Sequence, residues 1–141
     1  MKRSVLFFIG IALLFCFISN LSSFASDEEA VKQVIYDNVK AAQEENLKDY
    51  LNTLDPTSPE YSQKESLMEA LFKTFDFKYE VSDLKVTEIK DDMAKAVYSE
   101  KIIKVSGPDY KNNLTKRACI LKKINNSWKI YSSIILDVKY I

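Results

Sequence analysis

The last third of the chain has the pattern of a long β-hairpin, and this feature constrains the fold most. Residues 114–124 and 128–140 both have the alternation and the β-branched and aromatic content of strands. Between them lie Asn125 and Asn126, and asparagine tolerates the positive φ of a tight turn better than most residues. Two strands joined by so short a turn must pair antiparallel. The sequence therefore excludes a βαβ unit here, and Trp128 anchors the return strand.

Two further strands precede this hairpin. Apolar and charged residues alternate over residues 77–81, which is the period of a strand with one buried face. The pattern resumes out of phase at Leu84, and this slip near Ser82-Asp83 predicts a β-bulge. Asp91-Asp92 marks a turn, and residues 93–105 form the next long strand. The sequence thus predicts about four long strands in succession.

Helical patterns fill the region before the strands. Ser26 and Glu29 have the spacing of a capping box, and the apolar residues that follow predict a helix over residues 27–45. Asn46 can cap a second, short helix, and a third helix is expected over residues 59–74. Helices followed by a run of strands indicate an α+β domain.

The expected architecture is a cone-shaped, curved antiparallel sheet of about four long strands, packed on an N-terminal layer of two to three helices. Long, bulged strands curl as they twist. Side chains have difficulty filling the wide end of such a half-cone. We therefore expect a pocket between the sheet and the helices.

The N-terminus has the pattern of a secretory signal. A basic start at residues 2–3 precedes an apolar run over residues 5–18, and a small-x-small pattern ends at Ala25. We expect a signal peptide over residues 1–25, cleaved near Ala25, and one domain over residues 26–141 that is secreted, periplasmic or held at the cell envelope. The alternative is an uncleaved membrane anchor, although the apolar run is shorter than the ~20 residues of a spanning helix.

The composition excludes several kinds of chemistry. The sequence has no histidine, which rules out Ser-His-Asp and Cys-His catalysis and zinc sites with histidine ligands. Cys16 lies in the apolar run, so Cys119 is the one cysteine of the expected mature domain, and we expect it to be a buried small hydrophobe. Gly107 alone cannot make a glycine-rich phosphate loop. No cofactor and no metal is expected.

The charge balance excludes another class of partner. The chain has as many acidic as basic residues, and removal of residues 2–3 leaves a small net negative charge. A nucleic-acid-binding protein needs a basic face, so no nucleic acid is expected as a partner.

Six residues are candidates for the lining of the predicted pocket. They are Tyr36, Tyr50, Tyr79, Tyr98, Glu100 and Trp128. The structural alternative for the tyrosines is an ordinary core position in which the hydroxyl finds a partner. Glu100 shares a strand face with Tyr98 and could act as a general base if it is buried and unpaired. The alternative is a solvated glutamate, or one paired with Lys101 or Lys104. Asp109 and Tyr110 lie in a loop at a strand end, where ligand contacts often collect.

The order of these features resembles the nuclear transport factor 2-like superfamily, in particular its bacterial SnoaL-like branch. The features that carry the resemblance are Asn46–Leu51, Asp55-Pro56 with Ser58-Pro59, Tyr79-Glu80-Val81, Leu84-Lys85-Val86, residues 94–97, and Leu121-Lys122-Lys123 with Trp128-Lys129-Ile130. The resemblance implies a cone with a pocket for a small hydrophobic ligand, and homodimers that form through the sheet face. Members of this superfamily have many different functions, so the fold by itself does not identify an activity.

Three functions are consistent with the sequence. The first is a secreted, non-catalytic binding or interaction module. The second is a small lyase or isomerase that acts on a hydrophobic ligand, with a carboxylate as base; no acid–base triad of the superfamily's isomerases matches positions here. The third is a membrane-anchored component of an envelope assembly, which requires the apolar N-terminal segment to be retained.

Overall fold

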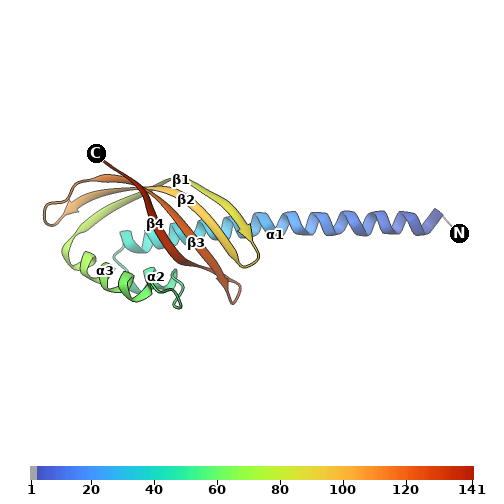
Figure 1. Cartoon of the computed structure of the whole chain (residues 1–141), viewed down its shortest axis with the longest axis horizontal. Coiled ribbons are helices and arrows are strands. Elements are labelled where there is room, and N and C mark those ends of the chain that lie inside the picture. Colours follow the sequence, from blue (N-terminus) through green and yellow to red (C-terminus); the bar gives the residue numbers. More distant parts are fainter. Residues whose placement is uncertain (1–2) are drawn as a thin grey trace.

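The computed structural model describes residues 3–141, with side chains from residue 23 onward. It contains three helices and four strands, in the order α1 (Arg3–Gln43), α2 (Leu47–Asn52), α3 (Tyr61–Thr74), β1 (Asp76–Lys90), β2 (Met93–Ser106), β3 (Asn113–Ile124) and β4 (Ser127–Tyr140). The strands form one antiparallel sheet in the order β1-β2-β3-β4. The sheet curves around the helices and does not close (Figure 1). The predicted α+β cone is confirmed.

The core forms where the C-terminal half of α1 crosses the concave face of the sheet (Figure 1). Val31 and Ile35 are fully buried there, against Leu121 and Ile130 of the last two strands. On β2 the buried positions are small, Ala94 and Ala96, followed by larger residues farther along the strand. Small side chains let a helix approach a sheet closely, so α1 fills the narrow end of the cone.

A polar clamp fixes the edge strand β1 to α1. The side-chain amide of Gln43 donates to the carbonyl of Phe77 at 3.0 Å, and its oxygen accepts the N–H of Tyr79 at 2.8 Å. The glutamine thus satisfies two backbone groups that an edge strand would otherwise leave open. This bond pair positions the start of β1 beside the end of α1.

Bulges and tight turns bend the sheet. The register of β1 against β2 shifts between Ser82 and Lys85, and Asp83 has a φ of 54°, which confirms the predicted bulge. Asn125 and Asn126 have φ values of 48° and 62°, as the predicted asparagine turn requires. A bulge increases the local twist of a strand, so these irregularities help the sheet curl into a cone.

The prediction of which residues of β4 share one face of the sheet was partly wrong. Strict alternation placed Trp128, Ile130, Ser132, Ile134, Leu136, Val138 and Tyr140 on one side. Register shifts against β3 interrupt this alternation, because Ile120 pairs with Ser132 while Leu121 pairs with Ile130. A second shift lies between Lys116 and Arg117 of β3. Directly paired residues share a face of the sheet, so the concave side of β4 carries Trp128, Ile130, Ser133, Ile135, Val138 and Tyr140.

The start of the first helix also differs from the prediction. Helix α1 begins at Arg3 and continues through Ser26, so the capping box expected at Ser26 and Glu29 does not form. Its N-terminal part projects away from the sheet (Figure 1). The side chains of the predicted signal segment lie, for residues 1–22, outside those that the structure describes. Between residues 23 and 141, no helix is long and apolar enough to cross a membrane.

Asp27 links this helix to the β3–β4 hairpin. Its carboxylate accepts hydrogen bonds from the ammonium of Lys123 at 2.8 Å and from the indole N–H of Trp128 at 3.1 Å. The bond from Lys123 is the main cause that lowers the pKa of Asp27 below its usual value. A carboxyl group whose pKa is lower in the folded state stabilises the fold above its unfolded pKa, and this stabilisation is lost as the pH falls through the folded value.

Replacement of Asp27 by Asn therefore destabilises the protein by about 1 kcal/mol at pH 7, because the amide loses the charge that strengthens both bonds. The difference between wild type and Asp27→Asn shrinks progressively as the pH falls below about 4. Urea unfolding at several pH values measures both effects. The control is Asp37→Asn, which removes an exposed carboxylate of the same helix and changes stability little. An equal loss in both variants, or a loss for Asp27→Asn that persists unchanged at pH 2, contradicts the assignment.

Candidate functional site

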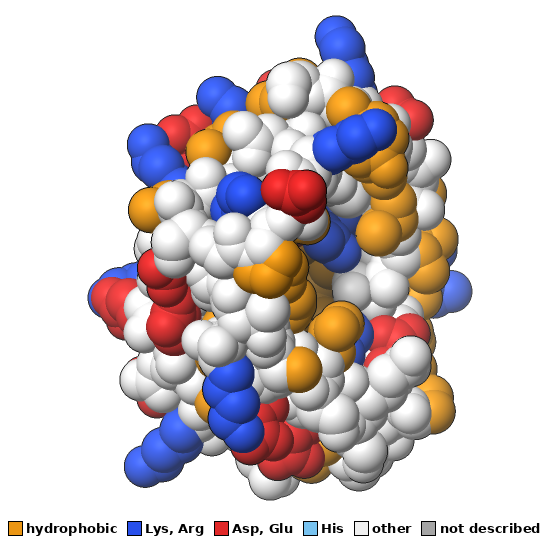
Figure 2. All heavy atoms as spheres, turned by 90° about the vertical axis from the view of Figure 1, so that its left-hand side faces the viewer, with side chains coloured by type: hydrophobic (Ala, Val, Ile, Leu, Met, Phe, Trp, Pro, Cys, Tyr) orange, Lys and Arg blue, Asp and Glu red, His pale blue; other side chains and the backbone are white. Residues whose placement is uncertain are grey.

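The wide end of the cone contains a cavity of about 270 Å³ between the concave face of the sheet and the helices. It is lined by Asn38, Ala42, Tyr50, Lys64, Leu67, Met68, Leu71, Phe77, Tyr79, Tyr98, Glu100, Ile102, Tyr110, Arg117 and Ser133. Figure 2 looks toward this end of the molecule, where a hollow opens with apolar side chains in its wall and basic side chains close to it. Helix α3 forms one wall of the cavity with Leu67, Met68 and Leu71.

The cavity continues into a second depression beside the end of β4. Ile102, Tyr110 and Arg117 line both of them. The second depression is bordered by Ile135, Val138 and Tyr140, the apolar residues that the shifted register of β4 brings to the concave face. Arg117 therefore stands between an inner cavity and an apolar mouth.

Four of the six predicted pocket residues line the inner cavity: Tyr50, Tyr79, Tyr98 and Glu100. Tyr36 lies on α1 and is 47% exposed, outside this cavity. Trp128 is buried beneath the β3–β4 turn, where its indole bonds Asp27, and it lines a separate groove between α1 and that turn.

The cavity wall holds a close ion pair. The guanidinium Nε of Arg117 donates to the carboxylate of Glu100 at 2.7 Å. The side chain of Glu100 is 9% exposed and that of Arg117 is 24% exposed. Burial disfavours the charge on Arg117, but Glu100 and the neighbouring groups favour it, and the pKa of Arg117 is raised overall. The two charges stabilise each other in a poorly solvated place.

The sequence-based expectation for the partner of Glu100 was wrong. Lys101 lies 3.8 Å from Glu80, and Lys104 donates to the carbonyls of Gly107 and Pro108. Arg117 was not among the candidates. It shares the concave face of β3 with Thr115 and Cys119 by alternation, and that pattern was the available signal, once β2 and β3 are placed in register.

Burial keeps the cavity tyrosines in their neutral form. It is the main cause that raises the pKa of Tyr50 to about 12, with a smaller contribution from the charge of Glu100. The pKa values of Tyr79 and Tyr98 are also raised, again mainly by burial, and Glu100 adds to both shifts. At neutral pH these three phenols retain their protons. Each can donate or accept a hydrogen bond inside the cavity.

Aromatic rings build the rim of the cavity beside β1. Phe77 lies 4.7 Å from Tyr110 and 5.9 Å from Tyr79, measured between ring centroids, and it stacks on Phe75 at 5.0 Å. The hydroxyl of Tyr110 accepts a hydrogen bond from the side chain of Asn113 at 2.7 Å. The loop expected to carry ligand contacts thus folds back over the strand, and its Tyr110 becomes part of the wall.

The chemistry available from the remaining groups is limited. Cys119 is buried, and burial raises the pKa of its thiol to about 11, so little reactive thiolate is present at neutral pH. Within the part of the chain that the structure describes, no group of three or more His, Cys, Asp or Glu side chains could hold a metal ion.

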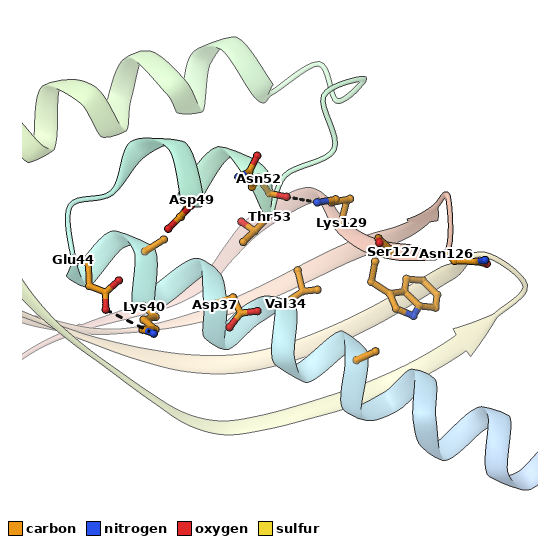
Figure 3. A pocket seen from close by; sticks show the side chains of 13 residues that line it. Val34, Asp37, Lys40, Glu44, Asp49, Asn52, Thr53, Asn126, Ser127 and Lys129 are labelled. Carbon is orange, nitrogen blue, oxygen red and sulfur yellow. Dashed lines mark hydrogen bonds and ion pairs between the residues drawn. The ribbon is translucent and has the colours of Figure 1, made fainter.

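A larger, open groove lies on the other side of α1. It has a volume of about 540 Å³ and runs between α1, α2 and the β3–β4 turn (Figure 3). Its charged side chains are engaged with neighbours: Lys40 lies 3.8 Å from Glu44, and Lys129 donates to the carbonyl of Asn52. Asp37 and Asp49 accept bonds from Gln33 and Asn46. The Glu100–Arg117 cavity, with its buried pair and neutral phenols, is therefore the better candidate site.

Solved structures with the same architecture have little sequence in common with this chain. A protein of unknown function from Mycobacterium tuberculosis is 9% identical, with a TM-score of 0.72 over 86% of this chain and 75% of that one. A conserved protein from Planctomyces limnophilus is 14% identical, with a TM-score of 0.70 over 83% and 99% of the two chains. An NTF2-like protein of unknown function from Pseudomonas putida is 11% identical, with a TM-score of 0.65 over 77% and 84%. These likenesses show the NTF2-like fold and nothing finer.

Sequence comparison identifies a nearer relation. The chain is 29% identical over 100 residues to the anti-sigma-I factor RsgI9 of Acetivibrio thermocellus, a match that covers 71% of this chain and 14% of the relative. The chain thus spans about one seventh of that protein. Residues 33–141 match the family described as the C-terminal domain of anti-sigma-I factor RsgI9. This match takes in all of α2, α3 and the sheet, and the chain belongs to that family.

Proposed function

We propose that this chain is a non-catalytic binding module that holds a small ligand in the cavity at the wide end of the cone. The observation that carries the proposal is the Glu100–Arg117 pair. Among the described residues that line the cavity, Glu100 is the one carboxylate, and it is bound to Arg117 at 2.7 Å. Apart from Lys64, which is paired with Glu60 at 2.9 Å, the remaining lining consists of apolar side chains and neutral hydrogen-bonding groups, which is typical of a recognition site.

A lyase or isomerase is the weaker alternative. Such an enzyme needs a carboxylate that takes up a proton from the ligand, held within hydrogen-bond reach of a phenol. Glu100 instead accepts the Nε–H of Arg117 at 2.7 Å, so one of its carboxylate oxygens is already occupied by a protein donor. Within the described residues, no hydrogen bond joins Glu100 to a cavity tyrosine.

The proposed location is outside the cytoplasm. The apolar N-terminal run supports either export with cleavage near Ala25 or retention as a membrane anchor.

The name of the relative, an anti-sigma factor, favours a sensory role in which ligand occupancy of this domain is reported to another part of a signalling protein. An anchored assembly component is the alternative, and it would use the outer face of the sheet, where Ile134 and Val105 are exposed, for a homodimer or another partner.

The ion pair provides a first test, since a structural pair in a partly dry cavity couples more strongly than a surface pair. In a double-mutant cycle of Glu100→Ala and Arg117→Ala, we expect a coupling of about 1.5–3 kcal/mol in the free energy of unfolding. The control is the exposed pair Glu88–Lys95 on the outer face of the same sheet, with nitrogen and oxygen 2.6 Å apart. Its coupling is expected to be clearly weaker, because water solvates and screens both of its charges. Equal couplings would show that Glu100 is not held by Arg117 as described.

Binding provides the direct test. The full chain is titrated with three small aromatic probes of similar size: phenylacetate, 2-phenylacetamide and phenethylamine. Ligand-observed NMR is expected to detect saturable binding of at least one of them, together with no chemical turnover. Leu71→Trp, on the inner side of α3, fills the cavity and abolishes this binding. The control Glu69→Trp places the same bulk on the exposed face of α3 and leaves it intact. Absence of binding by all three probes, conversion of a probe, or binding that survives Leu71→Trp, overturns the proposal.

A further inference from the structure

The inner cavity and its mouth differ in the charged side chains that line them. The inner cavity is lined by two cationic side chains, Arg117 and Lys64, and by one anionic side chain, Glu100. The tyrosines add no charge, because burial raises the pKa values of Tyr50, Tyr79 and Tyr98. At the mouth, Asp109 and Lys111 have opposite charges. Among the lining side chains themselves, positive charges outnumber negative ones by one.

Lys64 is already engaged at the edge of this cavity. Its ammonium lies 2.9 Å from the carboxylate of Glu60 and donates to the hydroxyl of Ser133 at 3.1 Å. Much of its charge is thereby neutralised locally. With Glu60 counted, two carboxylates balance the two cations, so what the cavity can offer an anion depends on the N–H donors that its cations have left.

Arg117 has donors left over after it pairs with Glu100. A guanidinium carries five N–H groups, and the bond to Glu100 uses the one on Nε. Among the residues that the structure describes, no protein acceptor bonds the Nη groups of Arg117. This end of the guanidinium presents two parallel N–H donors, the arrangement that binds a carboxylate with both of its oxygens. Its side chain remains 24% exposed, at the junction of the inner cavity and the mouth.

The surroundings of Arg117 suit an apolar molecule attached to that anion. On one side, α3 contributes Leu67, Met68 and Leu71, and Phe77 completes an apolar wall. On the other side lie Ile135 and the other apolar residues of β4. A cavity of about 270 Å³ is at the small end of ligand sites, which fits a molecule with a single ring or a short chain.

From this arrangement we infer that the ligand is a small organic carboxylate with an apolar or aromatic body, whose carboxylate binds the Nη groups of Arg117 while the body lies against α3. This inference rests on the proposed binding function and specifies the chemical class of the ligand. The role of Glu100 is then to hold the guanidinium by its Nε edge so that the other edge faces the cavity. Arg117 is the residue that determines specificity.

The test compares two probes that differ only in the head group, the anionic 3-phenylpropanoate and the neutral 3-phenylpropanamide, by isothermal titration of the full chain at pH 7. Wild type is expected to bind the carboxylate at least tenfold more tightly than the amide. In Arg117→Gln this preference disappears while the amide still binds. Because Arg117→Gln leaves Glu100 without its partner, the double variant Glu100→Gln/Arg117→Gln is measured beside it, and the same loss of preference is expected. The control is Lys85→Gln, which removes an exposed positive charge of β1 that borders neither the inner cavity nor its mouth, and it keeps the preference.

The outcomes separate this inference from the broader proposal. Equal affinity of wild type for both probes overturns the inference and leaves a neutral-ligand binding module standing. A preference for the carboxylate that persists in the folded double variant also overturns it, because another cation would then bind the anion. Failure of both probes to bind counts against this ligand class and, if the three probes of the broader panel also fail, against the binding function as a whole.

Discussion

A sheet that curls into a cone packs closely against a helix at its narrow end and leaves a hollow at its wide end. The side chains that line this hollow determine which ligands it can bind. Here the place that a large apolar side chain would fill is taken by Glu100 and Arg117. Two charges taken out of water need close geometry to repay the cost of desolvation, and the 2.7 Å contact from Nε meets this requirement for one edge of the guanidinium. The other edge still requires water or a ligand, so the pair keeps the cavity both open and polar.

The surrounding structure holds this pair in position from several sides. The bulge at Asp83 and the register shifts of β4 bend the sheet, while Gln43 ties the edge strand to α1 and Asp27 ties α1 to the β3–β4 turn. The Asp27 contact lies at the β3–β4 turn, away from the hollow, whereas Gln43 holds the backbone of Phe77 and Tyr79, whose side chains line it. Helix α3, which has few close contacts with the sheet, can therefore serve as a wall without filling the interior.

The sequence alone predicted the strands, their turns and the cone, because period-two alternation and asparagine turns are local signals. It also predicted four of the cavity residues, Tyr50, Tyr79, Tyr98 and Glu100. It did not predict Arg117 as the partner of Glu100, since that contact depends on the register between β2 and β3 and not on nearness in the chain. For the same reason it misplaced Ile134 and Ile135: a bulge in β4 has no clear mark in an apolar run. Tyr36 has helical spacing similar to that of buried residues, yet it lies outside the covered face.

The central claim is that the wide end of the cone is hollow and offers the free edge of Arg117 to an anion. The most direct measurement is a crystal structure of the full chain grown with 3-phenylpropanoate. We expect the phenyl ring between α3 and the sheet, with the carboxylate oxygens within hydrogen-bond distance of the Arg117 Nη atoms while Nε remains on Glu100. A hollow filled by side chains of α3, or a guanidinium turned away from Glu100 with the probe bound elsewhere, would contradict it.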